Sequence, residues 1–282
     1  MSESAVYRPH PEAPAIATLR SKAATDAWAG LHAQHFELVS RGDFVPGILY
    51  RCEPPDQGSK SASPLLLIQH ATADGADAGY LACAAAWAKK GLAVASIDLP
   101  LHGTRSSPKL SARLIEGIRR LARGEELDLD TGALVEEFAR QTTSDLIRTL
   151  DALSALPGID SDRIGFMGFG LGAIAGSYLL AHDSRPRAAV LALVGGGRGP
   201  ADLDPRTYLE RASETTPTSP GGREILVVAA EDDERVSKSE VDALFKAAPE
   251  PKELLRFPGS SRELTKGTLE KIEAFLRQAL GF

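Results

Sequence analysis

The sequence predicts an α/β domain built on a mostly parallel, doubly wound sheet. Two observations lead to this prediction. Short, continuously apolar runs such as 65–68 and 92–97 have the composition of strands that are buried on both faces. Helical segments separate these runs along the chain, and strands that alternate with helices are typical of parallel sheets.

The first part of the chain precedes this alternation. Residues 1–34 are rich in alanine and are expected to form an N-terminal helical extension. Two strands are predicted at 35–40 and 44–52, because the intervening Arg41-Gly42-Asp43 is typical of a hairpin turn. The remainder, 35–282, is expected to be one domain with an eight-stranded sheet.

Strands and helices then alternate to the end of the chain. Ligands of doubly wound sheets bind at the carboxyl ends of the strands, so the residues just after each strand are the candidate site residues. The expected strands are 65–68, 92–97, 163–167, 188–194, 224–229 and 253–257, and the expected helices are 80–90, 133–156, 171–181, 240–247 and 268–280.

Two segments interrupt the alternation. Residues 103–131 are charged and partly helical, whereas residues 195–222 are rich in glycine, proline, serine and threonine. Each segment could be either a cap over the strand ends or an excursion on the surface. We take 103–131 as the candidate cap insertion.

Composition narrows the classes of partner. The net charge is −6 without a basic stripe, which argues against nucleic acid, and no apolar run approaches the roughly 18 residues of a membrane span. Residues 1–20 lack the apolar core of a secretory signal, and Cys52 and Cys83 lack the spacing of a disulfide framework or zinc site. We therefore expect a cytoplasmic protein without a metal or cofactor, whose partner is a small molecule.

The most informative segment is 163–173, in which a strand runs through a glycine-rich turn directly into a helix. This turn resembles the nucleophile elbow of α/β-hydrolases, G-x-S-x-G. Gly168 and Gly172 match the two flanking glycines of that motif. Gly170 occupies the position of the nucleophilic serine.

Further motifs of the same family occur in the expected order. Residues 98–103, Asp-Leu-Pro-Leu-His-Gly, resemble the stretch after the fourth strand, and Gln69-His70-Ala71 resembles the His-Gly after the third. Residues 150–162 resemble the approach to the elbow strand in dienelactone-hydrolase-like and esterase-like members. The resemblance covers 35–282 and implies the α/β-hydrolase fold.

The resemblance also implies an acid and an oxyanion hole. Residues 227–236 resemble the stretch with the acid of the triad, and the spacing to the following valine selects Asp233, with Asp232 second. The backbone N–H groups of Leu171 and of Ala71 or Thr72 would form the oxyanion hole. Since backbone donors do not depend on the side chain, this hole is expected to persist and to hold a carbonyl, carboxylate or phosphate group.

Two departures from the family concern the chemistry itself. A nucleophile needs a side-chain oxygen or sulfur, and Gly170 has no side chain. The family's histidine follows the last strand, but all six histidines here precede residue 183, so that Ser261 or Arg262 occupies its position. We therefore expect a pseudoenzyme that binds a small molecule, without ordinary serine-hydrolase activity.

Two other catalytic interpretations stay open. His70 and His102, with Asp98, could supply acid–base chemistry for a lyase, cyclase or isomerase, although both histidines also fit a purely structural role in their loops. The other interpretation is a carboxylic-ester hydrolase whose histidine lies elsewhere in the chain. In the pseudoenzyme, Asp233 would be a vestige or would cap its own loop.

The glycine-rich string at 168–173 also fits the dinucleotide fingerprint G-x-G-x-x-A. That fingerprint follows the first strand of its sheet, whereas several strands precede this string. The next strand, 188–194, is followed by three glycines instead of the expected acid. The dinucleotide interpretation is therefore the weaker one.

Overall fold

The computed structural model describes residues 17–21, 31–52, 62–72, 75, 83–215, 222–260 and 264–282. In this part of the chain, nine strands form one sheet in the order β1-β2-β3-β5-β4-β6-β7-β8-β9. Along this order, neighbouring strands from β1 to β5 pair antiparallel, and neighbouring strands from β5 to β9 pair parallel. The prediction of an α/β fold with a mostly parallel sheet is confirmed.

The predicted hairpin is present. β2 (His32–Ser40) and β3 (Asp43–Arg51) pair antiparallel, with Ser40 opposite Asp43. The two residues between them, Arg41 and Gly42, have φ angles of 48° and 85°. Positive φ at both positions is what a two-residue turn of type I′ requires, and its twist matches that of the strands.

The helical prediction for 1–34 is wrong where the structure describes this segment. Residues Thr18–Ser21 form the strand β1, which pairs antiparallel with β2, and residues 32–34 belong to β2 itself. Pairing with β1 satisfies backbone groups that β2 would otherwise expose at the edge of the sheet, and this tertiary contact outweighs the helix propensity of the alanines. With β1, the described part of the chain forms nine strands, one more than the eight expected.

The parallel part of the sheet carries the buried apolar runs. Its central strands are almost fully buried, as expected for strands covered on both faces. A register shift lies within the longest strand, β6, where Ile164 gives way to Gly165. These strands are β4 (Ser63–Gln69), β5 (Ala93–Ile97), β6 (Ile159–Phe169), β7 (Pro186–Ala192), β8 (Glu224–Ala230) and β9 (Lys252–Phe257).

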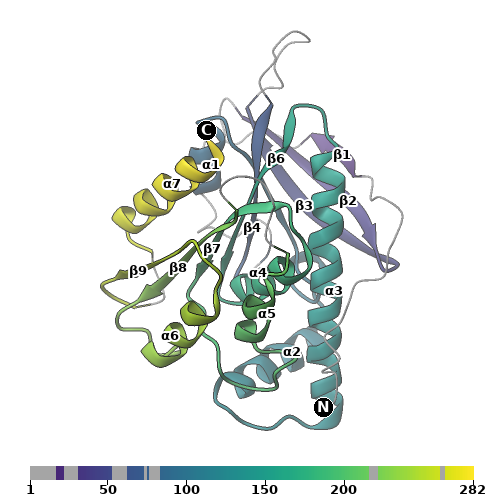
Figure 1. Ribbon diagram of the computed structural model, residues 1–282. Coiled ribbons are helices and arrows are strands. Elements are labelled where there is room, and N and C mark those ends of the chain that lie inside the picture. Colours follow the sequence, from purple (N-terminus) through teal and green to yellow (C-terminus); the bar gives the residue numbers. More distant parts are fainter. Residues whose placement is uncertain are drawn as a thin grey trace.

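Helices cover both faces of the sheet (Figure 1). On one face, α3 (Leu129–Ser154), α4 (Leu171–His182) and α6 (Lys238–Ala247) pack on a core that includes Phe166, Leu191 and Val227. On the other, α1 (Cys83–Ala88) and α7 (Lys266–Leu280) pack on a second core. In the part that the structure describes, no helix combines the length and apolar character needed to cross a membrane.

The two segments that interrupt the alternation contain helices of their own. Residues 103–131 form a 3₁₀ turn, η3 (Gly103–Arg105), the helix α2 (Pro108–Ala122) and the start of α3. The second segment, 195–222, contains α5 (Pro205–Arg211). Figure 1 shows α2 and α5 at the same end of the molecule, near the lower end of α3.

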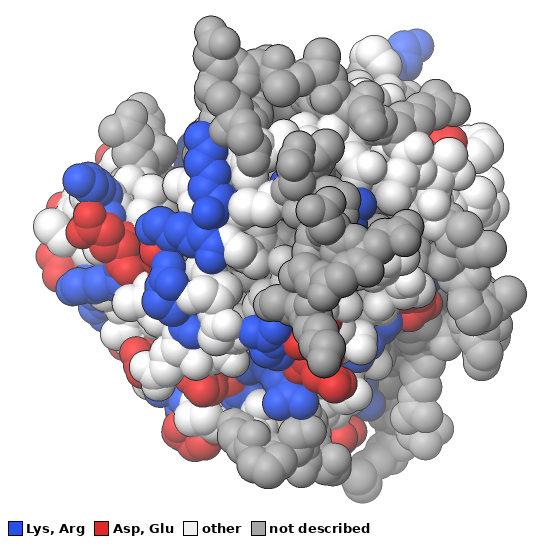
Figure 2. Space-filling view, turned by 90° about the horizontal axis from the view of Figure 1, so that it is seen from above, with Lys and Arg blue, Asp and Glu red and all other residues white. Residues whose placement is uncertain are grey.

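Charged side chains of both signs share the surface. Figure 2 shows Lys and Arg next to Asp and Glu over much of the described part of the face in view. The described part of the surface includes close ion pairs, such as Arg256 with Asp242 at 2.6 Å. Exposed pairs of this kind contribute little to stability, so the two apolar cores carry most of it.

Candidate functional site

The strand order places a ligand crevice between β4 and β6. From β4 the chain continues to β5 on one side, and β6 lies on the other, so the direction of winding reverses between them. In doubly wound sheets this reversal opens a crevice at the carboxyl ends of the strands. Ala71 and Thr72 follow β4 there, and Gly170 follows β6.

Gly170 lies at the apex of a sharp turn between β6 and α4. Its φ of 50° and ψ of −109° are a conformation that side chains disfavour. Its N–H donates to the carbonyl of Ala192 at 2.8 Å, and its own carbonyl accepts from Ala173 and Ile174 at 3.0 Å. Hydrogen bonds to β7 and to α4 therefore hold the turn from both sides.

The flanking glycines allow backbone to lie against backbone. A Cβ atom on Gly168 would lie 2.3 Å from the carbonyl oxygen of Gly172. A Cβ on Gly172 would lie 2.5 Å from the carbonyl oxygen of Gln69, at the end of β4. At Gly170 the nearest atom to such a Cβ is that of Ala71, at 3.8 Å. The elbow thus needs glycine at its flanks for space, while its apex has room for a side chain.

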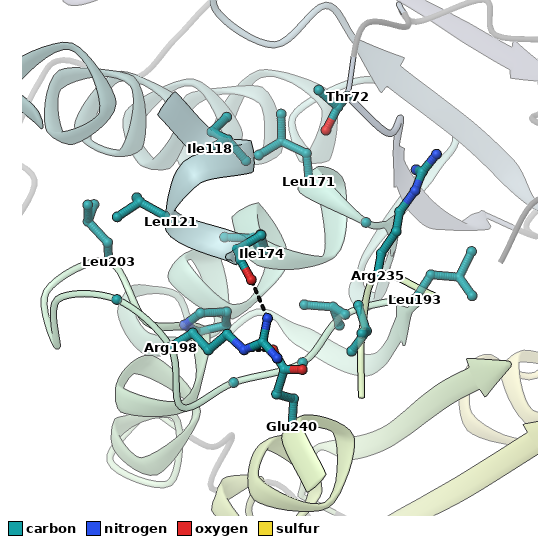
Figure 3. Close-up of a pocket in the computed structure, with 18 of the residues that line it drawn as sticks. Thr72, Ile118, Leu121, Leu171, Ile174, Leu193, Arg198, Leu203, Arg235 and Glu240 are labelled. Atoms are coloured by element: carbon teal, nitrogen blue, oxygen red, sulfur yellow. Dashed lines mark hydrogen bonds and ion pairs between the residues drawn. The ribbon is translucent and has the colours of Figure 1, made fainter. Parts of the chain in front are cut away.

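A pocket of about 290 Å³ opens at this elbow (Figure 3). Gly170, Leu171, Ala71, Thr72 and Asp233 all line it, so five residues that the sequence analysis assigned to one site are brought together. The volume lies at the lower limit of ligand pockets, which span about 300–1,000 Å³. A ligand of this pocket is therefore small.

Another wall of the pocket is mainly apolar and comes from both interrupting segments and from α3. Ile118 and Leu121 of α2, Phe138 of α3 and Leu203 before α5 line the pocket. Figure 3 shows Ile118, Leu121 and Leu203 on one side, with Ile174 of α4 beside them. An aliphatic group is the chemistry that such a wall accepts.

Asp233, the candidate acid, lies in the loop after β8. Its carboxylate oxygen Oδ1 accepts from the N–H groups of Arg235 at 2.8 Å and Val236 at 3.3 Å. The carboxylate is half-buried and caps its own loop. Asp232, the second candidate, is exposed and does not line the pocket; its N–H donates to the carbonyl of Gly259.

Ser261 and Arg262, the candidate positions for the histidine, lie outside the described residues. The neighbouring residues still locate the loop. The N–H of Glu231 donates to the carbonyl of Phe257, the last residue of β9, so the loop after β9 starts beside the loop that carries Asp233. None of the described pocket-lining residues is a histidine.

His70 is fully buried and fastens two loops together. Its Nε2 accepts from the N–H of Leu99 at 3.1 Å, so this nitrogen carries no proton. Its Nδ1 must then donate to the carbonyl of Ala71, 2.8 Å away. The imidazole is neutral, its tautomer is set by the backbone, and it does not line the pocket.

Asp98 and His102 organise the loop after β5. The Oδ2 atom of Asp98 accepts from the N–H of Thr104 at 2.8 Å and from its hydroxyl at 2.6 Å. His102 Nδ1 lies 2.8 Å from the carbonyl of Pro100, and the His102 ring centroid lies 5.5 Å from that of His70. Both side chains are buried and neither lines the pocket, an arrangement that favours their structural interpretation.

Tyr178 is a further titratable group on the pocket wall. Burial raises the pKa of its phenol well above the ordinary value, and its hydroxyl donates to the carbonyl of Leu203 at 2.8 Å. The phenol therefore stays neutral and is not a base. Among the described residues, no group of three or more His, Cys, Asp or Glu side chains is placed to hold a metal ion.

Three charged residues of the pocket escaped the sequence analysis: Arg198, Arg235 and Glu240. Arg198 pairs with Glu240, with Nε and Oε1 2.8 Å apart. Within the described part of the chain, the Arg235 guanidinium has no carboxylate partner within ion-pair distance. Figure 3 shows Arg235 reaching toward the side of Thr72, away from Leu203. Of these three residues, only Arg235 could have been assigned to the site from the sequence, because it lies two residues after Asp233.

Known structures share this architecture over nearly the whole chain. An acetyl xylan esterase from Paenibacillus sp. R4 is 16% identical, with a TM-score of 0.72, and the match covers 95% of this chain and 90% of that one. A cold-adapted esterase from an Arctic intertidal metagenomic library is 20% identical, with a TM-score of 0.69, covering 93% and 97%. The α/β-hydrolase GrgF from Penicillium sp. sh18 is 15% identical, with a TM-score of 0.60, covering 89% and 99%.

The chain has the α/β-hydrolase fold. No protein-family model matches the sequence, and no curated protein matches it, so the likeness lies in the structure. The resemblance inferred from the glycine elbow is thus confirmed as to fold. Within this fold, Gly170 lies in the turn between β6 and α4, and Asp233 in the loop after β8 lines the same pocket.

Proposed function

We propose that this protein binds a small molecule with a carbonyl or carboxylate group and an aliphatic part, and does not hydrolyse it. The observation that carries the proposal is Gly170, which leaves the apex of the elbow without an attacking atom. The pocket around this apex is nevertheless intact and largely apolar. A retained pocket without a nucleophile favours binding over hydrolysis.

The polar end of the pocket suits an oxygen-bearing group. The first N–H groups of a helix have no acceptor within the helix, and Leu171 is the first residue of α4. Together with the helix dipole, such N–H groups attract carbonyl and carboxylate oxygens. Arg235 adds a positive charge at the same pocket. The aliphatic part of the ligand would lie against Ile118 and Leu121.

Catalysis by a rebuilt acid–base mechanism has weaker support. Both ring nitrogens of His70 contact backbone, and neither His70, His102 nor Asp98 lines the pocket. A general base must reach the proton that it removes, directly or through one water. The esterases among the structural neighbours suggest ester hydrolysis by analogy, but that reaction needs a nucleophile that Gly170 does not supply.

Calorimetry with hexanoate, combined with an assay of p-nitrophenyl hexanoate, tests the proposal. We expect hexanoate to bind and the ester to be hydrolysed only at the rate of the buffer. Ile118→Trp should fill the pocket and weaken binding at least tenfold. The matched control is Leu110→Trp, on the same helix, because Leu110 is 47% exposed and does not line this pocket.

Two results would contradict the proposal. One is the absence of binding by hexanoate and by its methyl ester alike. The other is ester hydrolysis well above the background that is lost in Ile118→Trp, since this loss would place turnover in the pocket.

A further inference from the structure

Arg198 extends from a rigid loop between β7 and α5. The N–H of Gly197 donates to both carboxylate oxygens of Asp204, at 3.0 and 2.8 Å. Asp204 is only 3% exposed and also caps α5 by accepting from the N–H of Arg206. The backbone on which Arg198 stands is therefore held independently of its own side chain.

The guanidinium of Arg198 links two walls of the pocket. Its Nη1 donates to the carbonyl of Ala122, the last residue of α2. Carbonyl groups in the last turn of a helix have no N–H donor within the helix, and a cation there interacts favourably with the negative end of the helix dipole. Its Nε lies 2.8 Å from Glu240, which Ser237 holds in the capping box of α6.

This link lies across the pocket from the elbow. Figure 3 shows Thr72 and Leu171 on one side and Arg198 with Glu240 on the opposite side. The pocket follows α4 from Leu171 to Tyr178, a rise of about 10 Å at 1.5 Å per residue. An aliphatic chain anchored at Leu171 that extends across the pocket therefore meets this charged pair on the opposite side.

The Arg198 side chain is 42% exposed and forms part of the pocket wall. An aliphatic chain that pushed past it would have to separate the guanidinium from Glu240 and from the Ala122 carbonyl. Breaking charge-assisted hydrogen bonds of this kind is unfavourable. Among the described residues of the loop between β7 and α5, no other side chain is hydrogen-bonded to both α2 and α6.

We propose that Arg198 determines the length of the ligand by closing the pocket on the side opposite the glycine elbow. The inference rests on the proposed function, because it concerns the aliphatic part of the ligand held in that pocket. Arg198 is a specificity-determining residue in this proposal. It neither anchors the oxygen-bearing group nor takes part in any reaction.

Calorimetric titration with straight-chain carboxylates from butanoate to dodecanoate tests the inference on the full-length protein. In the wild type, affinity should rise by about fourfold for each added methylene and then fall sharply once the chain reaches Arg198. In Arg198→Ala, the rise should continue for at least two more methylenes. Arg198→Gln, which can reach only one wall, should shift the optimum in the same direction by less.

Arg206→Ala is the matched control, because Arg206 lies on α5 and does not line the pocket. Its optimum should equal that of the wild type. The inference is overturned if both Arg198 variants keep the wild-type optimum while still binding the shorter acids. If no acid binds to any of these proteins, the proposed function fails and this inference fails with it.

Discussion

The three glycines of the elbow meet two different physical demands. Gly168 and Gly172 are confined by neighbouring backbone, whereas Gly170 is confined only by its own dihedral angles. A side chain at Gly168 would push β6 away from α4, and a side chain at Gly172 would push α4 away from the end of β4. A side chain at Gly170 would cost backbone strain but would meet no close neighbour.

Gly172→Ala should therefore destabilise the protein strongly. The added Cβ would lie 2.5 Å from the Gln69 carbonyl oxygen, which is backbone and yields little, so we expect a loss of about 3 kcal/mol. Urea denaturation would measure it. Gly132→Ala is the control: Gly132 lies in α3 with nothing near the new Cβ, so it should gain about 0.5–1 kcal/mol. Equal effects of the two changes would contradict the close-packing interpretation.

At the scale of elements, an N-cap residue decides where α3 begins. The sequence pattern predicts that this helix begins near residue 133, but it begins at Leu129. The Asp128 side chain accepts from the N–H of Thr131 at 3.0 Å and from its hydroxyl at 2.7 Å. These bonds satisfy early groups of the helix and extend it by one turn.

The N-cap interaction of Asp128 makes the free energy of unfolding depend on pH. Hydrogen bonds from Thr131 lower the pKa of Asp128 from its ordinary 3.8 to about 2. An acid whose pKa is lowered by folding stabilises the folded state above its unfolded pKa, and this stabilisation is lost as pH falls through the folded pKa. Asp128→Asn keeps an acceptor but not the charge.

Thermal unfolding from about pH 5 to about pH 2 measures the effect of the cap. The wild type should be more stable than Asp128→Asn at the upper pH, and this advantage should shrink below pH 3.8 and vanish near pH 2. A difference in Tm that stays constant over this range would show that the charge of Asp128 does not contribute.

For the whole molecule, the sequence predicted the parallel half of the sheet well. Apolar runs such as the one in β8 are too short for helices and too continuous for half-exposed strands. β1 could not be predicted, because its four residues, Thr-Leu-Arg-Ser, carry no periodicity and become a strand only by pairing with β2. A local sequence pattern does not predict a strand that forms only by pairing with another segment of the chain.

The residues of the candidate site also fall into those that the sequence predicts and those that it does not. The residues around Gly170 and Asp233 were predictable, because close backbone approach and loop capping leave short motifs in the sequence. Arg198 was not, because its partners Ala122 and Glu240 lie 76 residues before it and 42 residues after it. Contacts between residues so far apart in the sequence exist only once the chain has folded.

The most direct test of binding without hydrolysis is intact-mass measurement after treatment with a fluorophosphonate, on the wild type and on Gly170→Ser. Neither protein should gain the mass of a phosphonyl group. The wild type has no oxygen at the elbow, and the variant has no histidine among the described pocket-lining residues to accept the proton. A phosphonyl adduct in the pocket of the wild type, or rapid labelling of the new serine, would show that a working catalytic base is present.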